Sequence, residues 1–191
     1  MKKIFSGLLG LFLVIGIVAG TGYALFSSKV GITGMVLGTS TPLLQASINN
    51  SAWSSTLPMG NNPMFQLLVP GKYDWGEFYL QNASNGGLKF NLTGKITAAQ
   101  GDWGLLSNVV QMRVCVYDTD PNILHCGAQN TGWKTLTQWN AGEVVLPGGA
   151  LNASEVRHLA INLYLDSDAG NGYIGKQISD ISFDITGTQI P

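Results

Sequence analysis

Charged side chains are scarce in this 191-residue chain, since Asp, Glu, Lys and Arg together make up 11% of it. That is less than half the usual share in soluble proteins. Ten Lys and Arg stand against eleven Asp and Glu, so the chain lacks the basic surface that binds phosphate backbones, and we expect no nucleic-acid partner. A soluble helical bundle is disfavoured too, because its exposed faces carry many charges. With 45% hydrophobic residues the chain can bury a core, and the composition is that of a β-protein.

Residues that carry catalysis are also few. The two histidines, His125 and His158, do not belong to a His-Glu-x-x-His motif, which puts two imidazoles on one helix face in metalloproteases. A zinc site that joins both histidines to a distant carboxylate stays open, but surface histidines are the favoured interpretation. The Gly-x-Ser-x-Gly motif of serine hydrolases is absent from the sequence. We therefore predict no enzyme and no cofactor.

The first residues have the pattern of an export signal. Two lysines precede an apolar run over residues 4–19, and a Thr-Gly-Tyr-Ala sequence places small residues before a cut between Ala24 and Leu25. A positive start, an apolar middle and a small-residue site define a secretory signal peptide. A retained membrane anchor is the alternative, because residues 4–26 are just long enough to span a bilayer. We predict a signal peptide over residues 1–24, contact with the membrane only before its cleavage, and a secreted, extracellular or cell-surface product.

Apolar and polar residues alternate after residue 60, which is the pattern of strands with one buried and one exposed face. The apolar sets predicted to face the core are Leu88, Phe90, Leu92 and Ile96; Leu159, Ile161, Leu163 and Leu165; and Ile181, Phe183 and Ile185. The residues that alternate with the second set are assigned to the exposed face: His158, Ala160, Asn162 and Tyr164. Shorter strands are predicted over residues 44–48, 65–69, 75–81, 109–117 and 143–146.

Turn-forming residues separate these segments, as at Pro70-Gly71, Asp120-Pro121 and Pro147-Gly148. Helical periodicity is confined to Trp133, Leu136 and Trp139, whose spacing by threes predicts one or two helical turns. Eight or so short strands in one domain predict an all-β, antiparallel two-layer β-sandwich. We assign residues 38–191 to this sandwich and residues 25–37 to an N-terminal β segment.

The chain has only two cysteines, Cys115 and Cys126. Thiols of exported proteins can oxidise, and this pair flanks the turn at Asp120-Pro121, which can bring two strands together. We predict a structural disulfide, which in the chain-entropy model stabilises the fold by about 3 kcal/mol. Two unpaired thiols are the alternative.

Acidic loops and tryptophans are the remaining candidates for binding. Asp166, Asp168 and Asn171 are candidate calcium ligands, because calcium prefers oxygen ligands on a loop; solvated turns are the favoured interpretation. Trp103 lies in a glycine-flanked loop and is predicted to be exposed, whereas Trp75 and Trp139 are predicted to fill the core.

Four segments, taken in order, resemble the camelysin / TasA-type family of secreted fibre-forming proteins. Residues 24–28, Ala-Leu-Phe-Ser-Ser, are similar to its cleavage region Ala-x-Phe-Ser-Asp, with Ser28 in place of Asp. Residues 30–38 resemble its first mature β segment. A Pro-Gly turn followed by Phe78, Leu80 and Asn82 resembles its x-x-Phe-x-Leu-x-Asn strand, and residues 168–186 resemble its closing glycine-rich turn and last strand.

The resemblance implies a jelly-roll-like sandwich that is exported, loses its signal and assembles with copies of itself into extracellular fibres of a biofilm matrix. In such pilus-like fibres the mature N-terminal segment completes the sheet of the neighbouring subunit, by donor-strand complementation. The corresponding donor here is residues 25–37. Its candidate assembly residues are Phe26, Val30, Ile32, Met35 and Leu37. Pairing of this segment within its own domain is the alternative.

Two other functions stay open. One is a monomeric surface adhesin or carbohydrate-binding module, which would bind matrix or glycans through Trp103 or the acidic loops. The other, ranked last, is a secreted metalloprotease. The low charge favours the fibre, because weak long-range repulsion lets identical copies stack.

Overall fold

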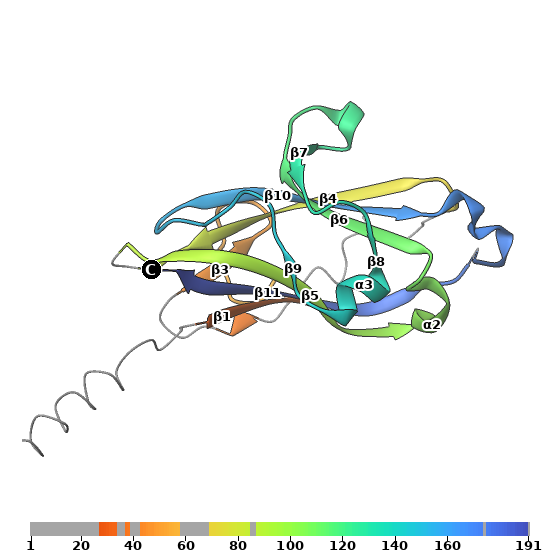
Figure 1. The fold of residues 1–191 in the computed structure, drawn as a ribbon, viewed down its shortest axis with the longest axis horizontal. Helices are drawn as coiled ribbons and strands as arrows, with labels where there is room; N and C mark the ends of the chain where they lie inside the picture. The colour runs from red at the N-terminus through yellow and green to blue at the C-terminus, as the bar shows by residue number, and fades with distance from the viewer. Residues whose placement is uncertain are drawn as a thin grey trace, which may run out of the picture.

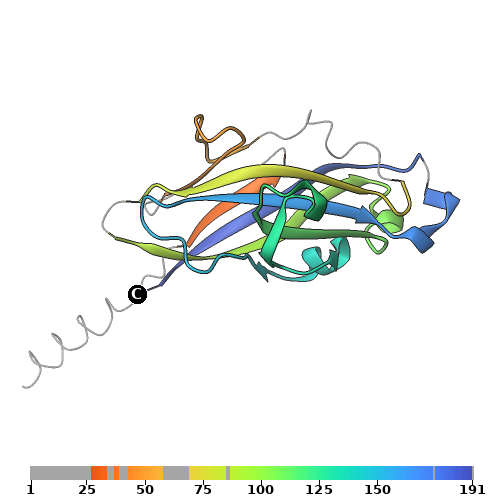
Figure 2. The ribbon, with the colours of Figure 1, turned by 90° about the horizontal axis from the view of Figure 1, so that it is seen from above.

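The computed structural model describes residues 27–33, 37–38, 43–57, 69–84, 87–173 and 175–190. These residues form mostly β-strands in antiparallel sheets that pack face to face (Figures 1 and 2). One sheet has the order β2 (Leu37–Gly38), β1 (Ser27–Thr33), β11 (Ile178–Ile190), β5 (Lys89–Gly101) and β9 (Val144–Val145). The other has the order β3 (Leu44–Ser47), β4 (Tyr73–Asn82), β10 (Val156–Leu165), β6 (Val110–Tyr117) and β7 (Cys126–Asn130), with β8 (Lys134–Thr135) beside β6. The predicted all-β fold of antiparallel sheets is confirmed.

Strand positions follow the alternation of the sequence closely. The strands β4, β10 and β11 include the segments predicted for them, β5 and β6 begin one residue later than predicted, and β3 lies within the segment predicted over 44–48. The segment predicted over 143–146 shrinks to the two residues of β9, which pair only with Thr93 and Gly94 of β5. The segment predicted over 65–69 lies outside the described residues except for Val69.

The core lies between the two sheets and includes most of the predicted apolar residues, whereas Leu88 and Ile181 are only half-buried. Phe90, Leu92 and Ile96 of β5 are buried, as are the four leucine and isoleucine residues from Leu159 to Leu165 on β10. Gly94 interrupts the β5 series, because a Cβ there would lie 2.6 Å from Cζ of the Phe183 ring. The Phe183 ring in turn meets the buried Trp139 ring edge to face, with centroids 5.4 Å apart.

The second face of β10 differs from the prediction. Ala160 and Asn162, which the alternation assigns to the exposed face, are fully buried. They lie under residues 118–130, which we call the arch. The arch runs from the end of β6 through the 3-10 helix η2 (Pro121–Ile123) into β7, and projects from the six-stranded sheet on the side away from the other sheet (Figure 1).

Two short helices connect strands of the sandwich, one between β5 and β6 and one between β8 and β9. The predicted helical turns correspond to α3 (Leu136–Ala141), which begins with a capping box between Thr135 and Gln138 and buries Leu136 and Trp139. A second helix, α2 (Trp103–Leu106), forms where a loop was predicted. It packs Trp103 against the core, so the prediction that Trp103 is exposed is wrong. Among the described residues, no helix has the length and apolarity needed to cross a membrane.

Among the described residues, Arg157 is the one buried cation, with 6% of its side chain exposed. Its guanidinium donates hydrogen bonds to the carbonyl oxygens of Gly149 and Ala150, each at 2.8 Å, and pairs with Glu155 at 2.8 Å. These bonds tie the loop between β9 and β10 to the sheet. A Cβ on Gly148 would lie 2.8 Å from Arg157 Nε, so the loop is shaped around this side chain.

We expect Arg157→Met to lower the free energy of unfolding by about 2–4 kcal/mol, because it leaves the carbonyl oxygens of Gly149 and Ala150 and the carboxylate of Glu155 without the buried guanidinium that donates to them. Lys89→Met is the matched control, since Lys89 is exposed; it should change stability by about 0.5 kcal/mol or less. Urea denaturation measures both. Equal stability of the two variants would show that the guanidinium does not hold the loop.

Candidate functional site

The outer face of the six-stranded sheet gathers aromatic side chains. On β4 the residues Phe78, Leu80 and Asn82 are buried, so the alternate positions from Tyr73 to Tyr79 face outward. The register places Tyr79 opposite His158, Trp75 opposite Asn162 and Tyr73 opposite Tyr164 on β10. Antiparallel pairing therefore brings rings from separate strands side by side.

The first group of rings, which we call the histidine stack, is centred on His158. Its imidazole stacks on Tyr79 at a centroid distance of 4.0 Å and on Tyr117 at 3.8 Å. Its Nε2 lies 3.0 Å from Oε2 of Glu77, which is also on β4. The histidine is thus held by two rings and one carboxylate.

The arch adds a second histidine to this stack. The His125 ring lies 4.1 Å from Trp75 and 5.2 Å from Tyr117, and His125 Nδ1 lies 3.0 Å from the carbonyl oxygen of Asp118. Leu124 and His125 both have left-handed backbone conformations, with φ of 57° and 54°. Such conformations cost about 1 kcal/mol or more each in residues other than glycine, so other contacts must hold the arch in place.

Two of these contacts come from β6 and β10. Cys115 of β6 and Cys126 of the arch form a disulfide, with Cα atoms 5.1 Å apart. Asn162 of β10 donates through Nδ2 to the carbonyl oxygen of Leu124 at 3.0 Å, and its Oδ1 accepts from Arg113 Nε at 2.9 Å. One buried amide therefore connects the arch, the central strand and a cation on β6.

A second group of rings lies beside that cation. Tyr73 stacks on Tyr164 with centroids 4.6 Å apart, and Trp133 lies 5.8 Å from Tyr73. The Arg113 guanidinium lies 4.4 Å from the centre of the Trp133 ring, which is within the range of a cation–π interaction.

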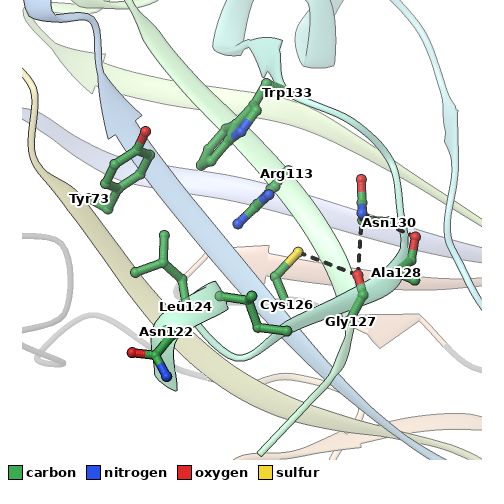
Figure 3. A pocket seen from close by; sticks show the side chains of 10 residues that line it. Tyr73, Arg113, Asn122, Leu124, Cys126, Gly127, Ala128, Asn130 and Trp133 are labelled. Carbon is green, nitrogen blue, oxygen red and sulfur yellow. Dashed lines mark hydrogen bonds between the residues drawn. The ribbon is translucent and has the colours of Figure 1, made fainter. Parts of the chain in front are cut away.

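Arg113, Tyr73 and Trp133 line an open hollow of about 640 Å³ between this second group and the arch (Figure 3). In Figure 3 Arg113 lies in the middle of the lining, with Trp133 on one side and Cys126 on the other. The arch contributes the remaining wall: Asn122, Ile123, Leu124, Gly127, Ala128 and Asn130. We call this feature the Arg113 hollow.

Partial burial shifts the pKa values of His158 and Arg113. Burial lowers the pKa of the His158 imidazole from its usual value of 6.5, and the nearby Glu77 carboxylate opposes this effect. Burial likewise lowers the pKa of Arg113, but a guanidinium keeps its proton in neutral water. At neutral pH the hollow therefore presents a fixed positive charge.

We expect the His158 imidazole to titrate below 6.5 in the folded protein, followed by its ring proton shifts in NMR spectra. Glu77→Gln should lower its pKa further, because it removes the anion that opposes burial. Since the unfolded chain then holds the proton more tightly, His158 should destabilise the fold as pH falls from about 7 through 6.5. A midpoint at or above 6.5 would contradict this.

Of the three predicted calcium ligands, Asp166 acts as a local cap. Asp166 accepts a hydrogen bond from the backbone N–H of Asp168 at 3.0 Å and caps the 3-10 helix η3 (Ser167–Ala169). Asp168 is exposed, and Asn171 begins η4 (Asn171–Tyr173). Across the described ranges, no cluster of three or more His, Cys, Asp or Glu is placed to hold a metal ion.

The predicted assembly residues fall only partly within the described ranges. Val30 and Ile32 lie on β1 and Leu37 on β2, whereas Phe26 and Met35, together with the cleavage site at Ala24 and Leu25, lie outside them. In this structure of a single chain, β1 pairs with β11 of the same chain over seven residues, from Ser27 opposite Thr188 to Thr33 opposite Ser182.

Sequence reasoning missed the aromatic outer face. It assigned Trp75 to the core, but Trp75 is half-buried on the outer face against His125. The signal was present in the alternation itself, because Trp75 and the core residue Phe78 are an odd number of positions apart and must point to opposite faces.

The fold and this surface define an antiparallel β-sandwich with a hollow on the outer face of one sheet. Comparison of the chain with protein-family models, with curated proteins and with solved structures found no match.

Proposed function

We propose that this chain is an exported structural subunit that assembles into extracellular or cell-surface fibres. The signal peptide is removed between Ala24 and Leu25, the mature chain folds as a jelly-roll-like sandwich, and its partner is a second copy of itself. Assembly proceeds by β-strand addition, in which the N-terminal strand of one copy pairs with the sheet of the next. The similarity to the camelysin / TasA-type family supports this function.

The position of β1 is the observation that carries the proposal. It is the first strand of the described residues, and beyond it the five-stranded sheet has only the two-residue β2. When β1 leaves, the long strand β11 becomes an open edge, which is a template for another chain. A β1 from a second copy can restore the same antiparallel ladder, with Val30 opposite Ile185 and Ile32 opposite Phe183.

Such an exchange costs little free energy. Each subunit loses its own ladder and gains an identical one, which is why swapping an element between copies costs little free energy. Phe183 and Ile185 are buried, so an unpaired β11 would expose core side chains. The small number of charges leaves little repulsion between neighbours.

We expect the purified 25–191 protein to form filaments visible by negative-stain electron microscopy after concentration. Deletion of residues 25–37 should abolish them and leave a soluble β-rich protein, because the deletion removes the donor strand. Filaments unchanged by the deletion would refute strand addition. A stable monomer that binds glycans saturably would instead support the adhesin, and cleavage of casein that stops with a chelator would support the protease.

A cross-link identifies which chain supplies β1. Ser27 lies opposite Thr188, so we expect filaments grown from an equal mixture of Ser27→Cys and Thr188→Cys proteins to yield a covalent dimer on oxidation. Non-reducing gel electrophoresis detects it. If β1 pairs only within its own chain, the mixture stays monomeric.

In the matched control, the Ser27→Cys protein is mixed with a Ser182→Cys protein in place of the Thr188→Cys protein. Ser182 lies opposite Thr33, which is six residues and about 20 Å along the strand from Ser27. This mixture should give no dimer. Equal dimer in both mixtures would indicate unspecific oxidation and contradict the proposed register.

A further inference from the structure

We propose that the Arg113 hollow binds an acidic saccharide, with the sugar carboxylate paired to the Arg113 guanidinium and the sugar ring packed on Trp133 and Tyr73. The inference concerns the outer face of the six-stranded sheet and does not depend on strand exchange at β11.

Among the described residues, Arg113 has no anionic partner. All eleven Asp and Glu side chains fall within the described ranges. The ion pairs in those ranges join Glu155 to Arg157, Glu77 to His158 and Asp102 to Lys176, and none includes Arg113. A partly buried cation without a counter-ion costs free energy, and a carboxylate that enters the hollow recovers part of it.

The guanidinium is also held ready for such a ligand. Its Nε donates to Asn162 at 2.9 Å and its plane lies over Trp133 at 4.4 Å. The Nη groups form no hydrogen bond with any of the described residues, and Arg113 lines the hollow. Since arginine pairs with carboxylates through two parallel hydrogen bonds, a preorganised guanidinium with free Nη groups fits that anion.

The walls favour a sugar over a peptide. Tyr73, of which 50% is exposed, and the half-buried Trp133 line the hollow with aromatic surface against which the C–H groups of a sugar can pack, and the exposed Asn122 adds an amide to the lining. The hollow is open to solvent rather than enclosed, so a bound sugar unit can remain part of a longer chain. A peptide would need an enclosed apolar pocket to anchor one of its side chains specifically, and the open hollow does not provide one.

The experiment uses the 25–191 protein and a defined probe, because the described fold lies within this range. Isothermal titration calorimetry compares a galacturonic acid hexamer with its methyl ester, which has the same number of sugar units and no charge. We expect the acid to bind about 10- to 100-fold more tightly than the ester, as for the loss of a charge-assisted hydrogen-bonded pair.

Variants then test the roles of Arg113 and Tyr73. Arg113→Gln should lower affinity for the acid to that for the ester, and Arg113→Lys should give an intermediate affinity, because it keeps the charge without the planar fork. Tyr73→Ala should weaken both probes alike. Lys89→Gln is the matched control, since it removes an exposed cation of β5 and should change nothing. Thermal unfolding checks that each variant is folded.

Several results would overturn the proposal. Equal affinity for acid and ester in the unmodified protein would exclude recognition of the carboxylate, and this result does not depend on how any variant folds. Equal losses in Arg113→Gln and Lys89→Gln would show unspecific attraction. Binding of a peptide with a free carboxylate but not of the hexamer would assign the hollow to a protein partner, and binding of neither would leave Arg113 a structural partner of Trp133 and Asn162.

Discussion

The outer face of this sandwich depends on the amide of one side chain, Asn162. The residue lies on β10, near the middle of the six-stranded sheet, and is fully buried. Its oxygen accepts from Arg113 and its nitrogen donates to Leu124. A buried amide that loses such partners costs about 1–3 kcal/mol, so the arch stays closed over the strand. Closure places His125 on Trp75 and keeps Arg113 beside Trp133.

The two sheets separate the two proposed activities. Strand exchange would take place at the β11 edge of the five-stranded sheet, whereas the Arg113 hollow lies on the outer face of the opposite sheet. A fibre built through β11 would therefore leave one hollow exposed on each subunit. Repetition along a polymer raises the avidity for a repetitive ligand without any new contact, so a fibre that carries this site would suit attachment to a polysaccharide.

Much of the fold could be predicted from local patterns. Period-two alternation placed the long strands, and the capping residues Thr135 and Gln138 explain why the helical spacing at Leu136 and Trp139 becomes a real helix. The candidate site could not be found in the same way. Its groups come from β4, β6, β10, the arch and the loop that carries Trp133 before β8, and their proximity follows from strand order and register, which no single segment encodes.

The errors have a common physical reason. Ala160 and Asn162 follow the exposed phase of their strand yet are buried, because a segment more than thirty residues earlier in the chain folds over them. Trp103 was assigned to solvent from its glycine neighbours, but the α2 turn packs it against the core. The alternation predicts on which face of a strand a side chain lies, but it does not predict whether another segment covers that face.

The sequence by itself determined the all-β fold class, because the alternation of apolar and polar residues and the positions of turn residues are properties of consecutive residues. It also determined that the core would contain the apolar residues of β5, β10 and β11. Only the tertiary structure decided that the opposite face of β10 is covered, that the histidines stack on tyrosines, and that Arg113 forms no ion pair with any residue of the described ranges. These features depend on contacts between distant segments, and such contacts exist only once the strands have taken their order in the sheet.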